Sequence, residues 1–408
     1  MNFTYFIANR YFLSKKKRNF ISILTLISMV GVAVGTMALI IVLSVFNGIE
    51  TSIKTMYSAF DAPIKISPAV GKSFLYTDSL KSKIKAIEGV SSVAEVIEDN
   101  ALFKYNNAQV VATLKGVSEE FIQQERLKNG IFIGKYALQS GNKEYAIMGR
   151  GIFYRLGAEL DNDFSVLQVF YPKATARAGS IDPSTLYEVS SIKPNAFFAL
   201  EKEIDDNYVI VPIAFAESLM SYEGKRTALE VEVSTASKIK SVQSALKSAL
   251  GAEFTVLNAD EQHSSLLKAI QIEKLFVYIT FSFILAVASF NIFFSLSMLG
   301  IEKKKDVAIL KAMGATDQQI KQIFRKIGAI IAFSGAALGL SLGYFICYIQ
   351  DTYGLVSLGI QSSLLDSYPV KMELLDFVFT SLSVIIITLV AAYRPAAIAA
   401  KVEPISQL

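Results

Sequence analysis

Residues 21–46 read ISILTLISMVGVAVGTMALIIVLSVF and contain no charged side chain. About 20 mostly apolar residues in a helix cross the roughly 30 Å hydrocarbon core of a bilayer, so this stretch predicts a membrane span. Its apolar run is longer than the roughly 7–15 residues of a signal peptide, and no A-x-A cleavage site follows it, so we expect a permanent anchor. The composition agrees with a membrane protein, because 52% of the 408 residues are hydrophobic and 19% are charged.

Three further stretches have the same apolar character. They are residues 275–299, 327–349 and 374–393. The last of them holds Asp376 near its start, where we expect the boundary between lipid and water. We therefore predict an α-helical membrane protein with four transmembrane helices, the first within 19–48 and the other three within 271–408.

Basic residues are distributed unevenly around these spans. They cluster at 15–18, before the first span, and at 303–326, between the second and third, whereas 350–373 holds one lysine. The positive-inside rule then places both termini and the 303–326 segment in the cytoplasm. Residues 1–18 combine aromatic side chains with a Lys–Arg run, which is typical of an interfacial helix lying along the inner leaflet.

The segment 49–270 lies outside the cytoplasm in this topology and is long enough for a folded α+β domain. Within it, LEVEVST at 229–235 alternates as a strand does. The stretch 237–251, SKIKSVQSALKSALG, has the period of an amphipathic helix that ends at Gly251. Residues 254–275 are predicted to lead into the second span as one continuous helix.

Residues 171–185, YPKATARAGSIDPST, have little periodicity and contain two prolines. Two interpretations remain open. The stretch is either an ordinary surface loop or a protruding arm that binds another protein, since loops on rigid scaffolds often carry binding residues.

The residues that catalysis or metal binding requires are scarce. His263 is the only histidine and Cys347 the only cysteine, so a zinc site lacks its usual ligands. The stretch 70–74, VGKSF, resembles the end of a phosphate-binding loop, but Ile66 stands where that motif needs its first glycine. We expect no ATPase and no cofactor in this chain. The net charge of +4 is carried mainly at the membrane flanks and gives nucleic-acid binding little support.

Small residues mark two of the spans as helix-packing surfaces. They are Gly31 and Gly35 in the first span, and Gly335, Gly339 and Gly343 in the third. A spacing of four residues places them on one helix face and permits close approach of a second helix. We expect the third span to pack inside its own bundle and the first against a second subunit. Asn291 in the second span is an amide that needs a partner, so we expect it to face protein or a cavity.

Residues 301–316, IEKKKDVAILKAMGAT, separate the second and third spans. Val307, Leu310 and Met313 recur every three residues, which gives one side of a helix an apolar ridge. Gly314 is a natural helix end, and Thr316-x-x-Gln has the spacing of a capping box that starts the next helix. We predict a short cytoplasmic helix at 303–314 whose apolar ridge binds a partner.

Four stretches of the chain resemble a known family. They are VGVAVGTMALIIVLSVFNGIE (30–50), LLKAIQIEK (266–274), IEKKKDVAILKAMGAT (301–316) and YRPAAIAAKVEPISQL (393–408). The Val-Leu-Ser-Val-x-Asn-Gly-x-Glu ending of the first stretch is a specific feature. Through them the whole chain resembles the permease subunits of the MacB/FtsX/LolCDE (type VII) ABC transporters, and within these the lipoprotein-releasing LolC and LolE group.

This resemblance implies a MacB-like periplasmic domain inserted between helices 1 and 2 of an FtsX-like permease in the bacterial inner membrane. It implies several partners: a separate cytosolic LolD-like ATPase that binds ATP-Mg, a second permease subunit, a lipoprotein cargo, a LolA-like periplasmic carrier and membrane lipid. The implied ATPase contacts are Asp306, Val307, Ile309, Leu310, Lys311, Met313 and Gly314. The implied cargo cavity contains Val42, Phe46, Asn47 and Asn291, and the implied carrier-binding loop contains Tyr171, Pro172, Arg177 and Pro183.

The expected function is therefore that of a non-catalytic permease, in which ATP hydrolysed by the partner drives extraction of lipoproteins toward the outer membrane. A MacB-like efflux permease and an FtsX-like signalling permease are alternatives within the family. FtsX-like chains usually have a smaller external domain, however, and MacB carries a fused ATPase. A membrane receptor is an alternative from another class, but it should have a cytosolic output domain, and only short loops are present here.

Overall fold

The computed structural model describes most of the chain, namely residues 3–13, 20–160, 166–173, 186–357 and 367–400. The chain divides into two compact units. The first unit contains the helical segments up to residue 51 and from residue 268 onward, and the second contains residues 52–267. The predicted inserted domain thus corresponds to a separate compact unit.

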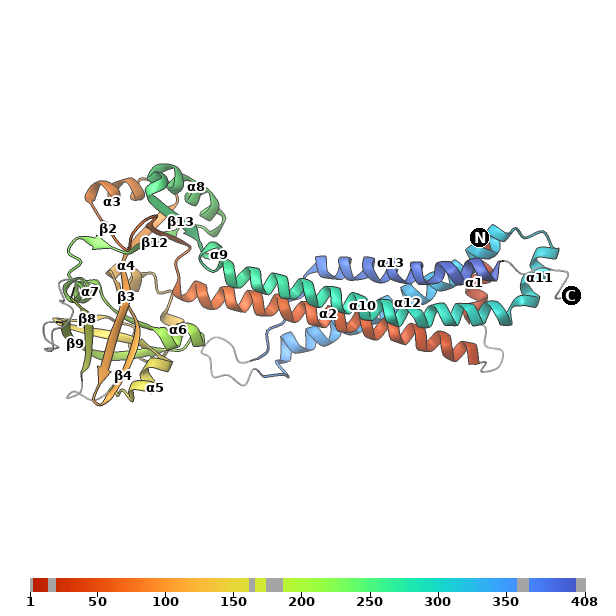
Figure 1. Ribbon diagram of the computed structural model, residues 1–408, viewed down its shortest axis with the longest axis horizontal. Coiled ribbons are helices and arrows are strands. Elements are labelled where there is room, and N and C mark those ends of the chain that lie inside the picture. Colours follow the sequence, from red (N-terminus) through yellow and green to blue (C-terminus); the bar gives the residue numbers. More distant parts are fainter. Residues whose placement is uncertain (1–2, 14–19, 161–165, 174–185, 358–366, 401–408) are drawn as a thin grey trace. The chain divides into compact units, whose positions relative to one another are not determined.

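The first unit is helical (Figure 1). Its helices are α1 (Phe3–Leu13), α2 (Phe20–Phe60), α10 (Ser264–Glu302), α11 (Lys304–Ala312), α12 (Asp317–Tyr353) and α13 (Leu374–Ala399), of which α2 and α10 continue into the second unit. Four of them, α2, α10, α12 and α13, are long and apolar enough to cross a membrane, which confirms the four predicted spans. Helices α2 and α10 extend well beyond their apolar runs, because the flanking sequence holds no proline to stop them.

The second unit is built on an 11-stranded sheet. The order along its main path is β13-β1-β12-β3-β4-β10-β7-β9-β5, with β6 paired to β7 and β8 to β3 and β9. The strands are β1 (Ile64–Pro68), β3 (Val90–Tyr105), β4 (Ala108–Val117), β5 (Ile131–Gly134), β6 (Gln139–Ser140), β7 (Lys143–Gly149), β8 (Leu167–Pro172), β9 (Tyr187–Phe198), β10 (Tyr208–Pro212), β12 (Ala228–Val233) and β13 (Phe254–Asn258). A separate two-stranded sheet joins β2 (Phe74–Leu75) to β11 (Lys225–Arg226).

Helices cover two different parts of this sheet (Figure 1). Helix α8 (Ile239–Leu250) packs on β13 and contacts α3 (Asp78–Lys85), whereas α5 (Arg150–Leu156) and α7 (Ile213–Met220) pack on β4. The shorter helices are α4 (Glu119–Gln123), α6 (Lys202–Asn207) and α9 (Ala259–Gln262). This unit therefore contains both strands and helices.

Two helices were predicted near the end of this unit, at 237–251 and at 254–275. The predicted helix at 237–251 is α8, and Gly251 closes it with a φ of +69°, which favours glycine. The predicted continuous helix at 254–275 is wrong. Residues 254–258 pair with β1 as a strand, and Asn258 then begins α9 through a capping box. His263 separates α9 from α10.

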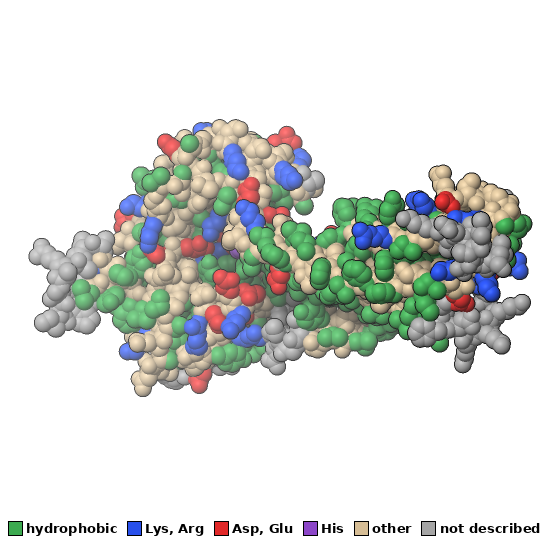
Figure 2. Space-filling model, turned by 45° about the vertical axis from the view of Figure 1, so that its right-hand side comes forward, with side chains coloured by type: hydrophobic (Ala, Val, Ile, Leu, Met, Phe, Trp, Pro, Cys, Tyr) green, Lys and Arg blue, Asp and Glu red, His purple; other side chains and the backbone are tan. Residues whose placement is uncertain are grey.

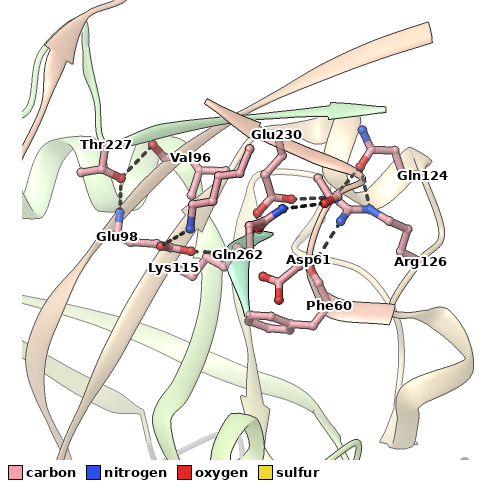
Figure 3. A network of polar contacts seen from close by, with 12 residues as sticks. Phe60, Asp61, Val96, Glu98, Lys115, Gln124, Arg126, Thr227, Glu230 and Gln262 are labelled. Atoms are coloured by element: carbon pink, nitrogen blue, oxygen red, sulfur yellow. Dashed lines mark hydrogen bonds and ion pairs between the residues drawn. The ribbon is translucent and has the colours of Figure 1, made fainter. Parts of the chain in front are cut away.

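A network of buried charges lies in the core of the second unit (Figure 3). The Glu230 carboxylate lies 2.7 Å from Lys115 Nζ and 2.5 Å from an Arg126 guanidinium nitrogen. Lys115 Nζ also lies 4.2 Å from the centre of the Phe60 ring, and Arg126 donates a hydrogen bond to the Phe60 carbonyl oxygen at 3.4 Å. Phe60 is the last residue of α2, so the network holds the carboxyl end of that helix, where a cation is favourable.

Candidate functional site

Helix α11 lies within the segment predicted to be the coupling helix. It runs from Lys304 to Ala312, and Gly314 follows with a φ of +100°. Thr316 and Gln319 then form the predicted capping box at the start of α12. The chain thus builds a nine-residue helix between two long helices, with a glycine turn that only a residue tolerant of positive φ adopts without strain.

The exposed side of α11 differs from the prediction. Val307 is 1% exposed and belongs to the core of the helical unit, and Leu310 packs against the same core. Ile309 and Met313, by contrast, are 49% and 79% exposed. Of the predicted ridge, Val307 and Leu310 face the core and only Met313 is exposed, because a helix joined by short turns to α10 and α12 needs one apolar face to pack on them.

Two charged residues of α11 make contacts inside the unit. Asp306 lies 3.4 Å from Lys303 Nζ, and its carboxylate is close enough to the Tyr11 hydroxyl to raise the pKa of that group. Lys311 Nζ donates to the Ala400 carbonyl oxygen at 2.7 Å and pairs with Asp317 at 2.7 Å. These side chains fix the position of α11, and the exposed apolar pair is left at its surface.

Helix α1 packs on α12 and brings Tyr11 close to Asp306 of α11. Thr4 and Ala8 are buried, and Lys326 of α12 donates a hydrogen bond to the Thr4 hydroxyl at 2.5 Å. Burial and the nearby Asp306 carboxylate raise the pKa of Tyr11 well above its usual value, so its hydroxyl stays protonated and able to donate. Helix α1 therefore packs on α12 along one face, and Phe3 and Phe6 remain exposed on another.

The predicted glycine face of α12 packs against α2. A Cβ placed on Gly335 would lie 2.9 Å from the Met29 carbonyl oxygen, and one placed on Gly339 would collide with the Ala33 carbonyl oxygen. Gly343 likewise faces Ile40 of α2. The three glycines thus allow α12 to approach α2 closely within the helical unit.

The two glycines of α2 have different surroundings. Gly35 faces Leu285 of α10, whereas among the described atoms none lies within 4 Å of a Cβ placed on Gly31. Near Gly31 the α2 side chains Ile27, Val30 and Val34 are exposed. Figure 2 shows hydrophobic side chains over much of the visible surface of the helical unit. The exposed side chains Ile27, Val30 and Val34 give α2 an apolar face around Gly31, and the first span is where we expected a second subunit.

The predicted cargo-cavity residues do not share one surface. Asn47 is 3% exposed and is held by Lys274 and Asp376, so it does not line an open cavity. Val42 and Phe46 are half-buried, and Asn291 is exposed on α10. Lys274 was not among the predicted site residues, and Asp376, predicted at the boundary between lipid and water, is buried within the protein. Lys274 and Asp376 carry opposite charges at the edges of two apolar runs. This pattern could have predicted that they pair.

The predicted carrier-binding loop extends from the β8–β9 hairpin, in which Pro172 pairs with Tyr187. The Tyr171 hydroxyl donates a hydrogen bond to Asp99 at 2.8 Å, which fixes the base of the loop. Arg177 and Pro183 lie outside the described residues.

His263 has a structural environment in the second unit. Its Nε2 lies 2.7 Å from Asp61, and its ring stacks on Tyr57 with centroids 3.7 Å apart. Within the described part of the chain, no group of three His, Cys, Asp or Glu side chains could hold a metal ion.

Comparison with known proteins identifies two family segments. Residues 25–249 match the model of the MacB-like periplasmic core domain, which is more than half of the chain, and residues 278–404 match the C-terminal domain of FtsX-like permeases. The second segment contains α11, α12 and α13, and the first contains most of α2 and of the sheet.

Two relatives match this chain over nearly its whole length. The chain is 22% identical over 418 residues to the lipoprotein-releasing system transmembrane protein LolE of Haemophilus influenzae, covering 99% of this chain and 98% of the relative. It is 24% identical over 420 residues to LolC of Neisseria meningitidis serogroup B, covering 98% of each. The periplasmic region of MacB from Actinobacillus actinomycetemcomitans is 12% identical, with a TM-score of 0.34, covering 52% of this chain and 94% of that one. The chain is a multi-pass membrane protein that belongs to the family of ABC transporter permeases with a MacB-like periplasmic core domain and an FtsX-like permease domain.

Proposed function

We propose that this chain is a permease subunit that extracts lipoproteins from the bacterial inner membrane, driven by ATP that a separate cytosolic ATPase hydrolyses. The single observation that carries the proposal is similarity over nearly the whole chain to lipoprotein-releasing LolE and LolC proteins. Lipoproteins are then handed to a LolA-like carrier in the periplasm. Both termini and α11 lie in the cytoplasm in this arrangement, which agrees with the basic residues around them.

The proposed docking surface for the ATPase consists of Lys305, Ile309 and Ala312 on α11 and Met313 directly after it. All four side chains are exposed and recur at helical spacing, and Ile309 and Met313 supply apolar area. Apolar side chains that water surrounds in a single chain are typical of a protein–protein contact. ATP-Mg binds to the partner in this proposal, and the permease contributes the surface through which the motion is transmitted.

A second permease subunit is proposed to cover the face of α2 around Gly31 and the face of α10 around Asn291. Gly31 permits close helix approach. Asn291 is a polar amide exposed on a membrane helix, and such a group is costly when it faces lipid tails. The lipoprotein acyl chains enter the space between the two subunits along these faces.

Depletion of the protein tests the proposed function in cells. Outer-membrane lipoproteins are expected to accumulate in the inner membrane, as measured by fractionation and immunoblotting, and a complementing copy should restore their distribution. An unchanged distribution in depleted cells would refute lipoprotein release and would favour an efflux or signalling role.

The Ile309→Asp variant tests the docking surface. The substitution places a charge where an apolar contact forms, and loss of one such central contact costs about 2 kcal/mol, or roughly 30-fold in affinity. The measurement is co-purification of the ATPase with the permease. Ile398→Asp is the matched control, since Ile398 is also exposed but lies on α13. Equal ATPase recovery from Ile309→Asp and Ile398→Asp would contradict the assignment.

A further inference from the structure

Asn47 lies within the first unit at a point where three long helices meet. Its side-chain oxygen accepts a hydrogen bond from Lys274 of α10 at 2.6 Å. Its amide nitrogen donates to Asp376 of α13 at 2.6 Å. Lys274 and Asp376 are themselves 3.4 Å apart. One asparagine on α2 therefore bridges both members of an ion pair that joins α10 to α13.

The neighbouring Gly48 allows the chain segment before α13 to lie directly on α2. A Cβ on Gly48 would collide with the backbone of Pro369. The Lys371 N–H donates to the Ser44 carbonyl oxygen at 2.9 Å, and the Asn47 amide donates to the Lys371 carbonyl oxygen at 3.3 Å. Residues 369–371 are thus fastened to α2 by backbone contacts that depend on a residue without a side chain at position 48.

The charges in this cluster are expensive unless they remain together. A lysine or aspartate in a membrane helix is stable only when it is paired or faces water. Removing one partner of a buried pair leaves an uncompensated charge. Lys274, Asp376 and Asn47 satisfy one another, and Asn47 is almost fully buried. Asn47 is therefore better suited to hold helices in place than to bind a ligand.

We propose that Asn47, Gly48, Lys274 and Asp376 form a latch that keeps α2, α10 and the start of α13 together as one body while the transporter works. The latch positions helices and does not contact cargo. Its contribution to transport rests on the proposed function: a helix end that moves independently would let ATP hydrolysis continue without releasing lipoprotein. The latch also accounts for the Asn-Gly that ends the apolar run of the first span.

Cysteine labelling tests the latch without cargo or ATPase. Cys347 is the only cysteine, so Cys347→Ser gives a background in which Val370→Cys, in the fastened segment, is the sole thiol. Lys274→Asp is expected to increase its labelling rate by a membrane-impermeant maleimide about tenfold, which corresponds to roughly 1.4 kcal/mol, within the range for contacting residues. The swap Lys274→Asp with Asp376→Lys should return the rate toward that of the parent.

The matched control is Lys268→Asp, which makes the same charge change on α10 at an exposed position. Gly48→Ala is a second test that changes no charge. Its added methyl group displaces the Pro369 backbone, so labelling should rise, and the charge swap should not restore it. This variant keeps the proposal testable if Lys274→Asp does not fold.

Lipoprotein release per ATP in proteoliposomes, with the partner ATPase present, tests the role in transport. Lys274→Asp should lower this ratio several-fold, and the swap should restore it; a purely structural defect would lower release and hydrolysis together. Unchanged labelling in both Lys274→Asp and Gly48→Ala, or failure of the swap to restore labelling, overturns the latch. If Lys274→Asp speeds labelling and the swap reverses this, the latch is supported. If the parent protein nevertheless releases no lipoprotein, the proposed function is refuted.

Discussion

Replacing Glu230 by glutamine tests whether the buried charge network stabilises the second unit. Glu230 is 1% exposed and contacts Lys115 and Arg126, as Figure 3 shows. Glutamine keeps the shape of the side chain and removes its charge. The variant therefore isolates the ionic contribution from the packing of the surrounding core.

The expected loss follows from the pKa of the carboxyl group. Burial alone disfavours the charged form of Glu230, but Lys115 and Arg126 outweigh burial and lower its pKa from 4.5 to about 2. That depression corresponds to roughly 3 kcal/mol of stability at neutral pH. It agrees with the roughly 3–5 kcal/mol lost when one partner of a buried pair is removed. Neighbouring carboxylates likewise outweigh burial and raise the pKa of Lys115, so both partners are charged at neutral pH.

Hydrogen exchange followed by mass spectrometry measures this loss in the full-length protein. Slowly exchanging amides of β12 and β3 should exchange about 100-fold faster in Glu230→Gln at pH 7. A lowered pKa contributes stability above the unfolded value of 4.5 and loses it as the pH falls toward about 2. The difference in exchange rate between the wild type and Glu230→Gln should therefore become smaller as the pH falls from 4.5 toward about 2.

Glu232→Gln is the matched control, two residues along the same strand. Burial raises the pKa of Glu232, although Arg126 partly offsets it, so neutralising this carboxyl should cost little. Its nearest cation, Arg126 Nε, is 3.7 Å away. Equal exchange in Glu230→Gln and the wild type, or equal losses in both variants, would refute the stabilising role of the network.

Three further variants test other parts of the molecule. Gly339→Leu should separate α12 from α2 and cost about 1–3 kcal/mol, seen as lower thermal stability in detergent, whereas Ala337→Leu, at an exposed position of the same helix, should not. Asp205→Asn should slow exchange of the second unit by a few-fold at pH 7.5 but not below pH 4, because burial raises the pKa of Asp205 to about 6 and its charged form opposes folding. Tyr11→Phe removes the hydroxyl that lies near Asp306, so ATPase affinity should fall by about 1 kcal/mol; an unchanged dissociation constant would show that α1 does not position α11.

The helical unit could be predicted closely because one physical rule dominates it. Each of the four spans needs a long apolar run, and the glycine spacing of α12 specifies a face that only another helix backbone fits. The direction of α11 was harder to predict. Val307 and Ile309 are both β-branched and apolar, and no local pattern decides which one packs inward. The positions of α10 and α12 decide it, and those depend on the whole bundle.

The prediction for residues 254–258 failed for a related reason. FTVLN stands next to a helical sequence and is too short to show its own period. It becomes a strand because β1, almost 200 residues earlier in the chain, offers an unpaired edge. Pairing between distant segments carries little local signal, so single-sequence reasoning assigns such a stretch to the neighbouring element.

The two asparagines of the membrane helices have different roles that the sequence alone could not distinguish. One holds helices together, and the other is available for binding. Asn47 and Asn291 both interrupt apolar runs, and both were assigned to one cargo cavity. Asn47 has ionic partners within the chain, so its polarity is fully used in holding three helices. Asn291 is exposed on α10, and lipid tails offer an amide no hydrogen bond. Because burying a polar group without a partner is costly, the Asn291 face, and not the Asn47 face, is where a second subunit or a cargo should be sought.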